Sequence, residues 1–116
     1  MTAAPAQAVN NWGTVGDLDQ AQLQACKVSV DGGDAWRVKL RVKNGNDYRV
    51  RSQVTVYDRQ RETDRTWRSG WVRAGSTSDQ GAVRTGREDG WKLVFSISAD
   101  QLGGGGVKRV SGIRLC

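Results

Sequence analysis

Cations occupy alternate positions in one short stretch of the chain. From Trp36 to Val42 every second residue is apolar, and the residues that follow each of them are Arg37, Lys39, Arg41 and Lys43. Successive side chains of a β-strand point to opposite faces, so this spacing predicts a strand with one apolar and one cationic face. Such a face could attract an acidic protein or an anionic polymer. Alternatively, an Arg-rich composition places long side chains there only to cover and solvate the sheet.

Two further arginines are expected to extend this cationic face. The sequence "NGND" at residues 44–47 contains an Asn-Gly pair, which favours a tight hairpin. Val54 and Val56 share one parity on the following strand, so the opposite parity is predicted to place Arg49 and Arg51 beside the four cations. Nucleic acid is disfavoured as the partner, because no aromatic residues interleave with these cations and no recognition helix is evident.

Residues that could support catalysis are few. The chain has no His, which removes the commonest general base and a usual metal ligand. The neighbouring acids Glu62 and Asp64, and Glu88 and Asp89, lie in Arg-rich segments. Solvated ion pairs are expected there, rather than two carboxyl groups with separated pKa values. We therefore predict a protein without enzymatic activity, cofactor or metal.

The two cysteines stand at the two ends of the region with a strand pattern. Cys26 and Cys116 are predicted to form a disulfide that closes a loop of about 90 residues, which corresponds to about 4 kcal/mol in the chain-entropy model. Two free thiols in a cytosolic protein are the alternative. The sequence "TAAPAQA" at residues 2–8 is typical of the end of a secretory signal. An oxidising, extracellular location is therefore expected, with Met1 added for expression.

Short strands are expected to carry these residues. The chain has 116 residues, a net charge of +6 and no run of about 18 apolar residues, which indicates one domain and no membrane span. From Cys26 onward, alternating segments are separated by turn signals. This pattern predicts an all-β fold, an antiparallel Ig-like β-sandwich of six or seven strands over residues 26–116. Gly103–Gly106 is expected to be a flexible linker. The predicted core residues are Trp36, Val38, Leu40, Val54, Val56, Trp91, Leu93, Phe95 and Ile97.

Residues 1–25 are predicted to form an N-terminal arm outside the sandwich. The segment is rich in Ala, Gln, Asn and Gly and has too little apolar content to fold alone. Within it, "GDLDQAQLQAC" could begin a short helix with Asp17 as its N-cap. Its spaced apolar residues could dock on a partner, for example by adding a strand to the partner's sheet, or pack on the arm's own domain. The partner-binding residues expected in the arm are Val9, Trp12, Val15 and Leu18.

Trp67 and Trp71 lie beside arginines in a segment that is predicted to be rich in loops. Both core packing and an exposed binding platform remain open for these two residues. The same segment, "RQRETDRTWRSG" at residues 59–70, could present an arginine to a trypsin-like protease. An inhibitor would need this segment to be a rigid, exposed loop.

Part of the chain resembles small secreted domains of actinobacteria. The residues that carry the resemblance are "ACKVSVDGGDAWRVKLRVKNGND" together with the terminal Cys116. They are similar to secreted polysaccharide-binding modules whose first and last strands are joined by a disulfide, and "VTVYD" at residues 54–58 resembles a strand common in bacterial extracellular Ig-like domains. The resemblance implies a sandwich fold and a binding function. The middle of the chain departs from it, because Arg-rich segments replace the expected Trp and Asn/Gln-rich strands.

The sequence as a whole favours a secreted protein that acts by binding. The first expectation is a protein-interaction module, an adaptor subunit of an extracellular bacterial assembly such as a toxin particle, which docks through its arm on a protein with an acidic surface. The alternatives are a carbohydrate-binding module, for which the partner would be a polysaccharide, and a secreted protease inhibitor.

Overall fold

The computed structural model describes residues 10–116, so the expected partner-binding residue Val9 lies outside the described residues. This range contains eight strands and two short 3-10 helices. In chain order they are β1 (Gly13–Leu18), β2 (Ala21–Val30), η1 (Asp31–Gly33), β3 (Ala35–Asn44), β4 (Arg51–Asp58), β5 (Arg61–Arg68), β6 (Gly81–Gly86), β7 (Trp91–Ser98), β8 (Gly103–Arg109) and η2 (Val110–Gly112).

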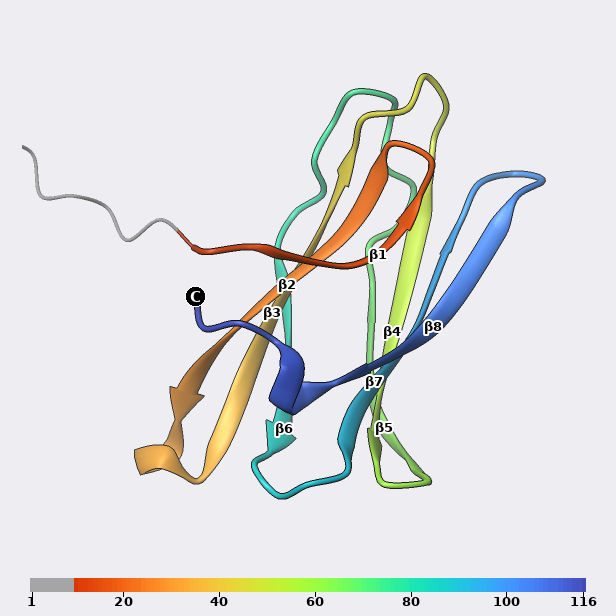
Figure 1. Cartoon of the computed structure of the whole chain (residues 1–116). Helices are drawn as coiled ribbons and strands as arrows, with labels where there is room; N and C mark the ends of the chain where they lie inside the picture. The colour runs from red at the N-terminus through yellow and green to blue at the C-terminus, as the bar shows by residue number, and fades with distance from the viewer. Residues whose placement is uncertain (1–9) are drawn as a thin grey trace, which may run out of the picture.

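The strands form two antiparallel sheets that pack face to face (Figure 1). One sheet has the order β1-β2-β3-β6 and the other has the order β5-β4-β7-β8. The predicted all-β antiparallel sandwich is therefore confirmed, with eight strands instead of six or seven. Within residues 10–116 no helix is long and apolar enough to cross a membrane.

Inward-facing aliphatic side chains of both sheets form the core. Six of the nine predicted core residues are buried: Val38, Leu40, Val54, Val56, Leu93 and Ile97. The three predicted aromatic residues, Trp36, Trp91 and Phe95, are partly buried and pack against this core. Gly16 of β1 lies so close to the Phe95 ring that a Cβ atom there would overlap it, which explains a glycine at this position of the strand.

The chain passes from one sheet to the other between β3 and β4, so the predicted hairpin is wrong. β3 pairs with β2 and β6, whereas β4 pairs with β5 and β7. The buried side chain of Asn44 holds this crossing in place. Its Nδ2 donates to the carbonyl oxygens of Tyr48, Val72 and Arg73 at 2.9, 3.0 and 3.2 Å, and its Oδ1 accepts from the Asn46 amide at 3.0 Å. These side-chain hydrogen bonds are present where a hairpin would have backbone hydrogen bonds between β3 and β4.

Residues 13–25 are part of the sandwich. β1 pairs with β2 in a hairpin that reverses at Asp19, where φ is 54°. The helix expected to begin at Asp17 is wrong, because Ala21, Leu23 and Ala25 alternate with Gln residues and fill the core with the period of a strand. The expected boundary at residue 25 therefore falls inside β2.

The predicted disulfide between Cys26 and Cys116 is present and joins β2 to the end of the chain. Beside it, the Lys27 amide donates to the Arg114 carbonyl at 2.9 Å, and the Cys116 amide donates to the Lys27 carbonyl at 3.0 Å. The expected flexible linker Gly103–Gly106 instead forms the first half of β8 and pairs with β7. The end of the chain is thus held by backbone pairing as well as by the disulfide.

Candidate functional site

Four of the expected cations lie together on the outer face of β3. Their side chains alternate with buried Val38, Leu40 and Val42, as the period of two predicts. The strand register places Arg84 of β6 directly opposite Arg37, although like charges opposite each other destabilise a strand pair. We use the name β3 cationic face for Arg37, Lys39, Arg41, Lys43 and Arg84.

Carboxylates compensate little of this charge. Arg84 forms an ion pair with Asp31 of η1. Within residues 10–116 the four β3 cations form no salt bridge. The sequence does not predict Arg84 as part of this face, because its place beside β3 depends on the strand order, which alternation along the chain does not reveal.

Neutral groups hold Arg41 in place. Its Nε donates to Gln24 Oε1 at 2.7 Å, and its guanidinium carbon lies 4.5 Å from the centroid of the Trp12 ring. Burial lowers the pKa of Arg41 from its usual high value. The side chain is therefore ordered by contacts that leave its positive charge without a counter-charge.

The apolar residues expected in the arm have different locations. Val15 and Leu18 belong to β1 and pack against the core of their own domain. Trp12 precedes β1, is partly exposed and stacks on Arg41 at the border of the β3 cationic face. Of these three residues, Trp12 is the one placed where a partner of that face could touch it.

Arg49 and Arg51 do not extend the β3 cationic face, so that prediction is wrong. Because the chain crosses between the sheets at residues 44–50, both arginines lie beside Trp71, with guanidinium carbons 4.0 and 4.7 Å from the centroid of its ring. Arg49 also pairs with Asp100 at 2.8 Å. The hydrogen bonds between them raise the pKa of Arg49 and lower the pKa of Asp100.

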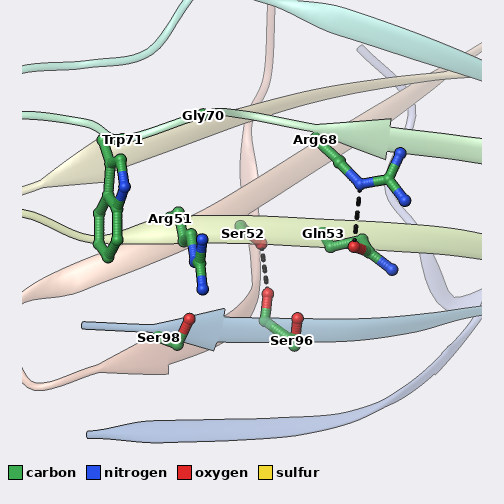
Figure 2. A pocket seen from close by; sticks show the side chains of 8 residues that line it. All are labelled: Arg51, Ser52, Gln53, Arg68, Gly70, Trp71, Ser96 and Ser98. Carbon is green, nitrogen blue, oxygen red and sulfur yellow. Dashed lines mark hydrogen bonds between the residues drawn. The ribbon is translucent and has the colours of Figure 1, made fainter. Parts of the chain in front are cut away.

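A shallow hollow of about 360 Å³ lies on the outer face of the second sheet, next to Trp71 (Figure 2). Figure 2 shows Trp71 and Arg51 at one end of this hollow and Gln53 with Arg68 at the other. Arg68 Nε donates to Gln53 Oε1 at 3.1 Å. We use the name Trp71 hollow for this surface, which is lined by Arg51, Ser52, Gln53, Arg68, Gly70, Trp71, Ser96 and Ser98.

The two tryptophans expected as a possible platform are separated in the structure. Trp67 lies on β5, is partly buried and packs against the core. Its ring lies so close to Gly81 that a Cβ atom at this glycine would overlap it. Trp71 follows β5 and is 39% exposed. The platform is therefore one ring, on which Arg49 and Arg51 stack, with hydrogen-bonding side chains beside it.

One of the acidic residues considered in the sequence, Glu88, is bound to a neighbouring indole group. Glu88 accepts a hydrogen bond from Trp91 Nε1 at 2.9 Å. Hydrogen bonds from its own backbone amide and from Trp91 lower the pKa of Glu88, so the carboxyl group is held in its ionised form. Within residues 10–116 no three His, Cys, Asp or Glu side chains lie close enough together to hold a metal ion.

The segment considered as an inhibitory loop has a regular structure. Residues 61–68 form β5, which pairs with β4 at residues 61–62 and again at residues 66–68, with an irregularity in the register between the two paired stretches. A protease inhibitor needs an exposed loop that enters the protease, whereas most of this segment lies in a strand. This arrangement gives no support to the inhibitor alternative.

No known protein family, curated protein or solved structure matches this chain significantly. What its surfaces can bind has to be judged from their geometry and charge.

Proposed function

We propose that this protein is a secreted, non-enzymatic interaction module that binds an acidic surface of another extracellular protein through the β3 cationic face. One observation carries the proposal: four cations share one face of β3 and form no salt bridge within residues 10–116. The disulfide between Cys26 and Cys116 is compatible with an oxidising extracellular location.

The cost of this charge arrangement supports a binding role. Four neighbouring cations, with Arg84 opposite Arg37, repel one another in the free protein. An acidic partner would remove that repulsion and would also be attracted over a distance of about 8 Å at physiological salt. Trp12 and Gln24 already order Arg41, so less conformational entropy is lost when a partner binds.

The two candidate surfaces lie on opposite sides of the sandwich. The β3 cationic face belongs to the outer side of one sheet, and the Trp71 hollow belongs to the outer side of the other. A second partner could therefore bind at the hollow without displacing the first. This arrangement suits an adaptor subunit of an extracellular assembly, such as a bacterial toxin particle.

Charge reversal tests the acidic-partner proposal. The variant Arg37→Glu/Lys39→Glu/Lys43→Glu is compared with wild type for binding to poly-L-glutamate by biolayer interferometry at 50 and 300 mM NaCl. We expect the triple variant to bind at least about tenfold more weakly than wild type, mainly because it associates more slowly. Binding of the wild type should depend strongly on the salt concentration.

A matched control changes the same net charge away from the face. The variant Arg61→Glu/Arg73→Glu/Arg109→Glu reverses three exposed arginines outside the β3 cationic face. Equal loss of binding in both triple variants would mean that net charge alone attracts the acidic polymer, and the proposal would be abandoned. Wild-type binding that does not respond to salt would also contradict it.

A carbohydrate-binding module is the second candidate function, and the Trp71 hollow favours it. Trp71 is exposed beside polar side chains from three neighbouring strands, among them Gln53, Arg68 and Ser96. Screening a glycan array with wild type and Trp71→Ala tests this function. Glycan binding that is lost in Trp71→Ala but kept in the β3 triple variant would support it, and the absence of glycan binding in wild type would exclude it.

A further inference from the structure

A cleft of about 400 Å³ opens between the two sheets at one end of the sandwich. Lys27 and Trp36 line it from the first sheet, Trp91 lines it from the second, and Arg87 borders it from the turn between β6 and β7. Val110 of η2 forms part of its wall. We use the name end cleft for this space.

The ammonium group of Lys27 is the unusual feature of the end cleft. The residue is only 7% exposed, and its Nζ lies 4.6 Å from the centroid of the Trp36 ring. The Nζ donates to the Val110 carbonyl at 2.8 Å and lies 3.5 Å from the Ser111 carbonyl. Within residues 10–116 it forms no salt bridge, although buried charges in proteins are usually paired.

Arg87 brings a second positive charge to the same ring. Its guanidinium carbon lies 3.8 Å from the centroid of Trp36, and its Nη2 donates to Ser29 Oγ. Burial, and then the charge of Arg87, lower the pKa of Lys27. The two cations thus disfavour each other, and neither forms a salt bridge within the part of the chain that the structure describes.

Apart from Lys27, the charged residues that line the end cleft are exposed. They are Arg87, Arg109, Glu88 and Asp89. The Glu88 carboxylate already accepts the Trp91 indole N–H at 2.9 Å. The buried charge of the cleft is therefore positive, whereas its exposed border carries both signs.

We propose that the end cleft binds a small molecule through an oxyanion group, a carboxylate, phosphate or sulfate, which contacts Lys27 and Arg87. An ammonium has three N–H groups, and the two carbonyl oxygens account for two of them, so an oxyanion would supply the third acceptor and the missing counter-charge. A guanidinium group also suits bidentate hydrogen bonds to such an anion. The volume lies within the range of small-molecule sites, and the indole rings leave apolar surface for the rest of the ligand.

The inference goes beyond the proposed function, because the end cleft lies between the sheets and not on an outer face. It is tested by titrating the protein with inorganic phosphate and, separately, with acetate at pH 7 and constant ionic strength set with NaCl. The indole N–H signals of Trp36 and Trp91 are followed by two-dimensional NMR. We expect saturable shifts of these signals with at least one of the two anions. Binding of phosphate alone would indicate a tetrahedral oxyanion, and binding of acetate would indicate a carboxylate.

Three variants separate a site from a general charge effect. Arg87→Gln and Lys27→Met should each weaken binding about tenfold, because each removes a charged hydrogen-bond donor. Arg73→Gln removes the same charge from an exposed loop near the other end of β3 and should bind like wild type. If Lys27→Met does not fold, Arg87→Gln alone decides. The absence of saturable shifts, or an equal weakening in Arg73→Gln and Arg87→Gln, would overturn the proposal.

Discussion

Replacing Asn44 with Ala should strongly destabilise the protein, because this side chain holds the crossing between the two sheets. Asn44 is 1% exposed, and its amide makes four hydrogen bonds, to Asn46, Tyr48, Val72 and Arg73. The alanine variant removes all four bonds and keeps the strand in which the residue lies.

The size of the effect depends on which partners keep another hydrogen bond. The Val72 carbonyl also accepts from the Val50 amide at 3.1 Å, and the Arg73 carbonyl also accepts from the Ser76 amide at 3.0 Å. The Tyr48 carbonyl and the Asn46 amide lose the partner that Asn44 provides. Leaving a buried polar group unsatisfied costs about 1–3 kcal/mol, so two such groups predict a loss of about 2–6 kcal/mol in the free energy of unfolding.

Urea unfolding, followed by tryptophan fluorescence, measures this loss. A domain of this size has a total stability of about 5–15 kcal/mol, so the variant should show a large shift of its midpoint or should not fold. Asn11→Ala is the matched control, because Asn11 is exposed, and it should change the stability by less than about 0.5 kcal/mol. A loss below about 1 kcal/mol in Asn44→Ala would refute the assignment of the crossing to these hydrogen bonds.

Three further predictions concern the core, the disulfide and one tyrosine. Leu93→Ala should cost about 2–5 kcal/mol in chemical denaturation, because Leu93 is fully buried, and a loss below about 0.5 kcal/mol would contradict the core. The Cys26→Ser/Cys116→Ser variant should lose about 2–5 kcal/mol in the free energy of unfolding. Alkylation of the native protein without reductant should leave its intact mass unchanged, and a gain in mass would show that the thiols are free. The hydrogen bond to Asp19 raises the pKa of Tyr48 to about 12. Since the folded state then holds this proton more tightly than the unfolded state, its stabilising effect should be present below about pH 10 and be lost as the pH rises toward 12. NMR titration of the Tyr48 ring should show this high pKa in wild type and a value near 10 in Asp19→Ala, and equal values in the two proteins would refute it.

Local alternation in the sequence was sufficient to predict several features. The period of two from Trp36 to Val42 correctly predicted a strand with Val38 and Leu40 in the core and four cations outside. The same reasoning found the core positions of β7. The disulfide could be predicted because its two cysteines flank the patterned region, and only one pairing is possible. Each of these features depends on neighbours within one strand or on a single choice.

The tertiary structure decided which strands are neighbours and which charges share a surface. Alternation assigns each side chain to a face of its own strand, but it contains no information about the sheet to which that strand belongs. Asn44 forms hydrogen bonds to Val72 and Arg73, which are distant in the sequence, and these bonds stabilise the crossing of the chain into the second sheet. The crossing separates Arg49 and Arg51 from the cations of β3. The end cleft also results from contacts between residues that are distant in the sequence.

The burial of Lys27 depends on such long-range contacts. In the sequence it is one cation among many in a strand pattern, and only the approach of Val110 and Trp36 buries its ammonium group. The sequence by itself thus determined the strands with clear alternation, such as β3 and β7, their apolar faces and the disulfide, because these follow from residue type and spacing. The pairing of the strands and the composition of both candidate surfaces and the end cleft came from long-range contacts, which depend on the competition of all strands for the same core and the same hydrogen-bond partners.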